Sequence, residues 1–224
     1  MTVHDIARQL PEIAVLRDHC RAMAMVDAVL EPEGTFRYHS FDARWSETEE
    51  AALMRNGAGD EYAVVFSPAG AYIRGFAHES LMSPYEADTV WPGVLDEVPE
   101  AFRPQVEEPA FADEDGIPVV TACLWRETGD DGWRTGTIEF PESEDDDPGD
   151  PDGAGFLFQL LADRSAVAFQ DWAADYYERP VDFAAVRHIF ALRPLTAAVV
   201  KALNSEITLD DLAEDIQEIR YPVG

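Results

Sequence analysis

The sequence predicts an α+β fold, in which an antiparallel sheet built from hairpins is packed by an N-terminal helix and a C-terminal cluster of about four helices. Runs of β-type residues fill the middle of the chain, whereas helical periodicity marks both ends. Short turns, and not helical crossovers, join these runs, which favours antiparallel pairing over a doubly wound sheet.

An apolar stripe predicts the N-terminal helix. Its members recur at steps of mostly three or four residues: Ile6, Leu10, Ile13, Leu16, Cys20, Met23 and Leu30. We expect Pro11 to divide this helix, because proline lacks the amide donor that a helix interior needs. Pro32 and Gly34 should end it.

The middle of the chain reads mainly as strands. We expect strands over 36–41, 62–66, 71–76, 117–126 and 133–140, and a short helix over 48–55. Turns at 67–70 and 129–132 should close two hairpins from these strands. The stretch 84–115 is rich in proline and glycine, so it should hold a helical turn or two at most.

The last part of the chain returns to helical periodicity. Apolar stripes predict four helices, which begin near Phe169, Phe183, Leu195 and Leu209. An acidic segment precedes them, and its composition predicts an exposed loop over 141–153. We therefore expect a single domain over 1–224, with helix and antiparallel strands in 1–140 and a helical part in 154–224.

The charge balance excludes some partners. Forty-five Asp and Glu face 16 Lys and Arg, a net charge of −29. A field of this sign repels nucleic acid and anionic membranes, but it attracts a basic protein. The general acidity of the host's proteins would also produce it, as a solubility device. The single lysine, Lys201, is typical of a GC-rich genome, so the excess of arginine carries no chemistry.

The sequence predicts a cytoplasmic location. Cys20 and Cys123 match no zinc pattern or disulfide framework and read as reduced core residues. The first five residues lack the basic start and the apolar run of a signal peptide. No stretch approaches the roughly 18 consecutive apolar residues of a membrane helix.

The sharpest candidate site follows the strand predicted over 71–76. Arg74, His78 and Glu79 lie within a few residues of one another, and His39 would join them if its strand were a neighbour. Histidine can act as a general base, glutamate can orient it, and arginine can hold an anion. The structural alternative is that His78 and Glu79 only tie the loop to the backbone.

Other signatures of chemistry fail. No His-Glu-x-x-His pair or Cys–His spacing for zinc occurs, and neither Gly-x-Ser-x-Gly nor a Walker A loop is present. An EF-hand register with glycine at Gly153 would begin at Pro148 and put Gln159 where a bidentate Glu belongs. We therefore expect no metal and no cofactor.

A proline-rich aromatic loop is a candidate partner surface. It contains Tyr85 and Trp91, and aromatic residues dominate interface hot spots. The alternative is that these rings cover an edge of the sheet.

Two functions from different classes follow. The first is a non-enzymatic interaction protein whose acidic surface binds a basic partner, as a small bacterial immunity protein or inhibitor binds its target. The second is an enzyme or small-molecule binder that uses the loop of His78 and Glu79 with Arg74. The absence of a catalytic signature favours the first, and a homodimer through the C-terminal helices is compatible with both.

Overall fold

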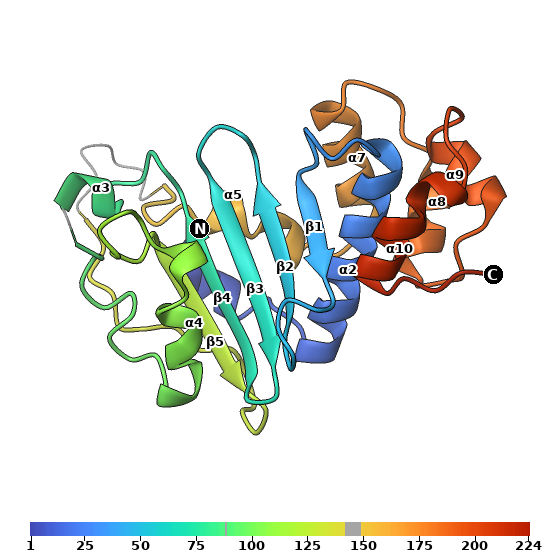
Figure 1. The fold of residues 1–224 in the computed structure, drawn as a ribbon. Coiled ribbons are helices and arrows are strands. Elements are labelled where there is room, and N and C mark those ends of the chain that lie inside the picture. Colours follow the sequence, from blue (N-terminus) through green and yellow to red (C-terminus); the bar gives the residue numbers. More distant parts are fainter. Residues whose placement is uncertain (88, 142–148) are drawn as a thin grey trace. The chain divides into compact units, whose positions relative to one another are not determined.

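The computed structural model describes residues 1–87, 89–141 and 149–224 (Figure 1). Among them, five strands form one sheet in the order β1-β2-β3-β4-β5, and the β1–β2, β3–β4 and β4–β5 pairs are antiparallel. The strands are β1 (His39–Asp42), β2 (Glu50–Arg55), β3 (Glu61–Ser67), β4 (Gly70–Phe76) and β5 (Ala122–Glu127). With helices before and after the strands, the predicted α+β class is confirmed.

Most of the longer helices lie where the apolar periodicity of the sequence predicts them. The longer ones are α2 (Ile13–Leu30), α7 (Ala166–Tyr176), α8 (Phe183–Phe190), α9 (Ala197–Leu203) and α10 (Ala213–Ile219). The shorter ones are α1 (Val3–Ala7), α3 (Pro84–Ala87), α4 (Arg103–Val106), α5 (Ala154–Leu157) and α6 (Gln159–Ala162), with 3₁₀ turns η1 (Glu100–Phe102), η2 (Pro109–Phe111) and η3 (Asp210–Leu212). The predicted break of the N-terminal helix at Pro11 is confirmed, because α1 ends before it and α2 begins after it.

The chain forms two compact units, and each contains two segments of the sequence. Unit 1 consists of Met1–Ile13 and Arg55–Ala162, and unit 2 of Ala14–Met54 and Asp163–Gly224. The prediction of a single domain stays a prediction.

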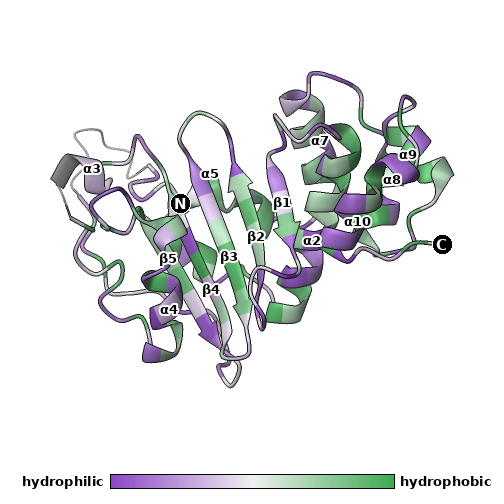
Figure 2. Ribbon diagram, viewed as in Figure 1, coloured by the Kyte–Doolittle hydropathy of each residue, from purple (hydrophilic) through white to green (hydrophobic). Residues whose placement is uncertain are grey.

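Figure 2 shows long hydrophobic stretches in the strands, whereas α10 is largely hydrophilic.

In unit 1, strand β4 is buried along its whole length. On one face, the ring of Tyr72 lies 6.2 Å from that of Phe102. On the other, a Cβ at Gly75 would lie 2.6 Å from the ring of Phe158, so only glycine lets that ring approach the strand. Because both faces are covered, β4 is buried throughout, Arg74 included, without the alternation of a half-exposed strand.

In unit 2, helices α7, α8 and α9 pack on one another in chain order. Helix α7 packs on α8, and the rings of Phe169 and Phe190 are 5.1 Å apart. The hydroxyl of Tyr221 donates to the carbonyl of Ile189 at 2.8 Å and ties the C-terminal segment to α8. Helix α10 contacts β1. The amide of Ala43, just after that strand, donates to the carbonyl of Glu218 at 2.9 Å.

The helix predicted over 48–55 is wrong, because this segment forms β2. The segment contains four residues of high helix propensity: Ala51, Ala52, Leu53 and Met54. The strand instead pairs with β1, with Ser40 opposite Leu53, and tertiary pairing outweighs a preference of a few tenths of a kcal/mol per residue.

The second predicted hairpin is only partly present. Strand β5 begins at Ala122, not at 117, and the segment 133–140 meets it only at one bridge between Trp125 and Arg134. Beyond that bridge, the amide of Thr137 donates to Glu97 at 3.1 Å. The backbone of Gly136 also lies so close to Gly93 that a Cβ would be 1.9 Å from its carbonyl oxygen. Packing against the 93–97 loop therefore replaces a full strand pairing.

Most of the acidic loop predicted over 141–153 lies outside the described residues, which omit 142–148. At its end, the expectation of exposure is wrong for Asp152, which is fully buried and accepts a 2.8 Å hydrogen bond from the amide of Val3. Burial raises the pKa of the Asp152 carboxyl to about 6. Asp150 accepts from the amides of Gly155 and Phe156 at the start of α5, so these acids organise the backbone of unit 1.

None of the helices in the described part of the chain combines the length and the hydrophobicity that crossing a bilayer requires.

Candidate functional site

The imidazole of His78 is held by a carboxylate that comes from another segment of unit 1. Asp60 Oδ1 lies 2.9 Å from both the backbone nitrogen and Nδ1 of His78, so Nδ1 donates to the carboxylate. Glu79, the partner expected from the sequence, is 89% exposed, and its Oε1 lies 3.9 Å from Nε2 of His78. The oriented pair is therefore His78 with Asp60, and sequence reasoning missed Asp60.

The loop before β3 positions Asp60. The side-chain amide of Asn56 donates to Asp60 Oδ2 at 2.6 Å, and Asn56 Oδ1 accepts from the amides of Ala58 and Asp60. Gly59 has a φ of +111°, and a Cβ there would lie 3.2 Å from Cγ of His78. Glycine thus lets the loop turn and lets the imidazole lie against it.

The pair has the electrostatics of an oriented base. Its hydrogen bond to Asp60 raises the pKa of His78, although desolvation opposes this change. The same bond lowers the pKa of Asp60 against the effect of its own burial. The side chain of His78 is 41% exposed, so Nε2 remains accessible to a solute. An imidazole held at Nδ1 with an accessible Nε2 can accept a proton from a bound molecule.

We expect Asp60→Asn to lower the pKa of His78, because the amide removes the negative charge that stabilises the imidazolium. NMR titration of the His78 ring in the intact protein measures this change. The matched variant Glu79→Gln should lower the pKa less, since Glu79 is exposed and farther away. A larger effect of Glu79→Gln than of Asp60→Asn would contradict this assignment. A raised histidine pKa stabilises the folded state at low pH, and the contribution is lost as the pH rises through that pKa.

Arg74 does not join His78. Its guanidinium is 3% exposed, forms an ion pair with Glu61, donates to the carbonyl of Val119 and lies 4.6 Å from the ring centroid of Phe111. In the described residues, no hydrogen bond or ion pair joins Arg74 to His78. The prediction that Arg74 holds an anion beside the His78 base therefore has no geometric support.

His39 belongs to unit 2 and is part of a second, buried histidine–aspartate pair. Asp27 Oδ2 lies 2.8 Å from both the backbone nitrogen and Nδ1 of His39. The rings of Tyr38 and Trp172 lie 4.8 Å and 4.9 Å from the imidazole. With 3% exposure, this imidazole is closed to solutes, so its role is structural.

Tyr85, one of the two candidates for a partner surface, lines a surface pocket of unit 1. A pocket of about 470 Å³ is lined by Pro84, Tyr85, Ala112, Asp113, Glu114, Asp115 and Ile117; it is called the acidic pocket below. Tyr85 is 60% exposed, and its ring rests edge-on at 5.5 Å from that of Phe76. The lining thus combines an accessible aromatic ring with a run of three acidic residues.

The carboxylate wall is a short turn with a fixed backbone. Asp113 Oδ1 accepts from the amides of Asp115 and Ile117 at 3.0 and 2.8 Å, and the amide of Asp113 donates to the carbonyl of Ile117 at 2.9 Å. Gly116, with a φ of +81°, completes the turn. No ion pair within the described residues neutralises Asp113, Glu114 or Asp115, although most arginines of unit 1 are paired. The wall therefore presents negative charge that is not compensated locally.

Trp91 does not line the acidic pocket. It is half-buried, and its indole nitrogen donates to the carbonyl of Glu139 at 2.9 Å. Of the two partner-surface candidates, Tyr85 faces an open pocket, whereas Trp91 anchors its own loop. The prediction that they bind a partner stays a prediction.

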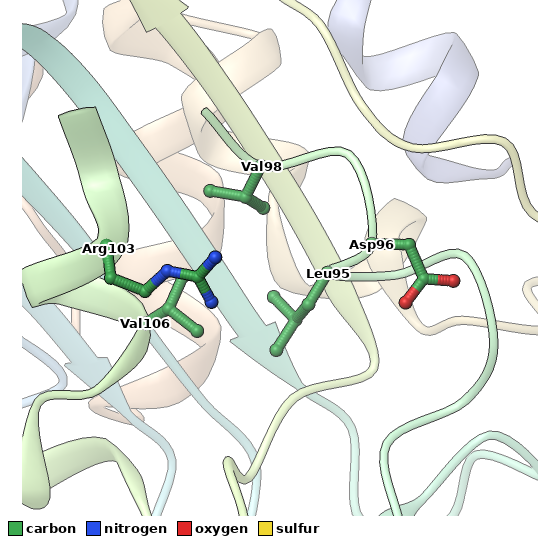
Figure 3. Close-up of a pocket in the computed structure, with 5 residues that line it drawn as sticks. All are labelled: Leu95, Asp96, Val98, Arg103 and Val106. Carbon is green, nitrogen blue, oxygen red and sulfur yellow. The ribbon is translucent and has the colours of Figure 1, made fainter. Parts of the chain in front are cut away.

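A third feature of unit 1 is a pocket of about 290 Å³ lined by Leu95, Asp96, Val98, Arg103 and Val106. In Figure 3 the guanidinium of Arg103 points toward Leu95 and Val98, whereas the carboxylate of Asp96 points away from them. Asp96 accepts from the amide of Gly93 at 2.8 Å, and Arg103 lies 3.5 Å from Glu100. The polar groups of this pocket thus have partners, and it offers little to a ligand.

Within the described residues, no three histidine, cysteine or acidic side chains come together to hold a metal ion. Both cysteines are buried, and burial raises the pKa of the Cys123 thiol to about 12, which makes it a poor nucleophile.

Comparison of the chain with protein-family models, with curated proteins and with solved structures finds no match in any of the three.

Proposed function

We propose that the chain is a cytoplasmic, non-enzymatic interaction protein that binds a basic protein partner, and that the acidic pocket is its recognition site. The observation that carries the proposal is the pairing of an exposed Tyr85 with three uncompensated carboxylates around one pocket. A partner would insert an arginine or lysine side chain between them. Such a side chain satisfies both walls, because its charge meets the carboxylates and its cation lies near an aromatic ring.

The net charge of −29 supports the same partner at long range. A strongly negative surface accelerates association with a basic protein and slows it for an acidic one. Local contacts must then hold the complex, and an exposed tyrosine is among the residue types that dominate interface energies. Overall charge therefore governs the association rate, and the contacts in the acidic pocket govern the dissociation rate.

The test is affinity capture from host lysate with three baits, followed by titration of the purified partner. The first bait is the natural chain, and the second carries Asp113→Asn, Glu114→Gln and Asp115→Asn. The third is the matched control, with Glu33→Gln, Glu47→Gln and Asp171→Asn, which removes the same charge from exposed sites of unit 2. We expect the second bait to bind about tenfold more weakly than the third, and Tyr85→Ala to cost about 2 kcal/mol, the scale of a hot spot.

Retention should also fall with added salt, since the charges involved are exposed. Equal binding by the second and third baits would show that the acidic pocket is not the recognition site. If the natural chain retains no basic protein at low salt, the proposed interaction is contradicted and the acidity is explained by solubility alone.

A second candidate function is small-molecule binding or catalysis at His78. The observation that favours it is the pair of His78 and Asp60, which comes from two segments and leaves Nε2 accessible. Ligand-detected NMR of a small-molecule library against the natural chain and His78→Gln tests it. Hits that bind both proteins equally would exclude His78 as their site.

A further inference from the structure

One surface of unit 2 has a charge opposite to that of the whole chain. A pocket of about 540 Å³ is lined by Ala184, Arg187, His188, Ala191 and Arg193 at the end of α8; it is called the cationic pocket below. Carboxylates outnumber Lys and Arg by 45 to 16 in the sequence, yet none lines this pocket. The two arginines among the lining residues therefore have no carboxylate beside them in the pocket.

The two guanidiniums are available to a ligand. Arg187 and Arg193 are exposed, and no ion pair within the described residues links either of them to a carboxylate. Arg187 lies 5.8 Å from the ring centroid of Phe183, a contact that leaves the donors of its guanidinium accessible. Elsewhere in unit 2, by contrast, Arg21 and Arg37 are paired with acids at 2.6 and 2.5 Å.

The backbone at the end of α8 holds the pocket in shape. Nε2 of His188 lies 2.9 Å from the carbonyl oxygen of Pro194, and because a carbonyl only accepts, this nitrogen donates. The amide of Arg193 donates in turn to the carbonyl of His188 at 3.3 Å, and Leu192 has a φ of +49°, so the chain reverses sharply between the two arginines. The small side chains of Ala184 and Ala191 leave the space between the cations open.

A cation near the end of a helix also offsets its dipole, which accounts for Arg187 in the last turn of α8. This does not account for Arg193, which lies beyond the helix and lines the same pocket. Two guanidiniums facing one space match the oxygens of a phosphate group, which they can bind through paired hydrogen bonds. The volume falls within the usual range for small-molecule sites.

We infer that the cationic pocket binds a small phosphate-bearing anion through Arg187 and Arg193. The inference concerns unit 2 and does not depend on the acidic pocket of unit 1.

Isothermal titration calorimetry of the intact chain at low salt tests the inference, with inorganic phosphate, phenyl phosphate and citrate as probes. The variant Arg187→Gln/Arg193→Gln removes both guanidiniums. The matched control, Arg44→Gln/Lys201→Gln, removes two exposed cations of unit 2 that do not line the pocket. We expect saturable binding of a phosphate probe by the natural chain, weakened about tenfold or more in the pocket variant and unchanged in the control. Circular dichroism should show that all three proteins are folded, with thermal stabilities that differ only slightly, because the substituted side chains are exposed and Arg187 only offsets the helix dipole.

Comparing inorganic phosphate with phenyl phosphate distinguishes free phosphate from a phosphate ester as the ligand. Phenyl phosphate binds more tightly only if the pocket also contacts the group attached to the phosphate. Three results would overturn the inference. They are no saturable binding of either phosphate probe, equal weakening in the control variant, and citrate binding as tightly as both phosphate probes.

Discussion

Arg74→Ala is expected to destabilise the protein by about 3 kcal/mol, the low end of the cost of breaking a buried ion pair. The substitution removes the partner of Glu61, the donor to the Val119 carbonyl and the group that packs on Phe111. It also leaves a cavity inside unit 1. The low end applies because Glu61 is one-quarter exposed and keeps Arg55 at 3.3 Å. Urea unfolding followed by tryptophan fluorescence measures the loss.

Two further variants separate the causes. Arg74→Met keeps most of the volume and should recover part of the loss, which then measures packing apart from charge. Arg103→Ala removes an exposed arginine with two acidic neighbours, Glu100 at 3.5 Å and Glu107 at 4.0 Å, and should cost less than about 1 kcal/mol. If Arg74→Ala proves no more costly than Arg103→Ala, Arg74 is not a structural residue and its candidacy for ligand binding returns.

Asp27→Ala is expected to have an effect of similar or greater size in unit 2, about 3–5 kcal/mol. Asp27 and His39 are almost completely buried, and one carboxylate oxygen accepts both hydrogen bonds of His39. Removing it strands two donors among the rings of Tyr38 and Trp172, where water cannot replace the carboxylate. The same charge contributes, after burial, to the raised pKa of Tyr177.

The partly exposed pair of unit 1, whose Asp60 side chain is 13% exposed, provides a control with the same geometry. Asp60 accepts from the backbone nitrogen and Nδ1 of His78 just as Asp27 does from His39, but the His78 side chain is 41% exposed. Water can therefore replace Asp60, and Asp60→Ala should cost about 1 kcal/mol. Chemical denaturation of both variants at one pH makes the comparison. Equal losses would show that burial does not decide the strength of these pairs.

The contrast between the two pairs also bears on the candidate sites. In the sequence, His39 lies within the strand predicted over 36–41 and His78 follows the one predicted over 71–76, and neither position shows which imidazole is exposed. In the structure one is closed inside unit 2 and the other is accessible in unit 1. Neither aspartate partner could be inferred, since Asp60 is 18 residues from His78 and no motif joins them. Only the folded chain brings each carboxylate to its imidazole.

The acidic pocket shows the same division. Tyr85 could be singled out from the sequence, because an aromatic residue in a proline-rich loop is typical of a partner surface. The carboxylates of Asp113, Glu114 and Asp115 could not, because 45 acids are scattered over the chain and nothing marks these three. Their turn and Tyr85 line one pocket in the folded chain, and a local sequence pattern does not encode this proximity.

The sequence by itself determined the α+β class, the break at Pro11, the first hairpin and the C-terminal helices. These follow from local rules, such as the 3.6-residue apolar stripe and the proline that cannot donate. Tertiary structure alone decided that 50–55 is a strand, that 133–140 meets β5 at a single bridge, and that Asp152 is buried. In each case the deciding energy comes from pairing or burial against residues distant in sequence, and it exceeds the small local preferences that a sequence pattern reports.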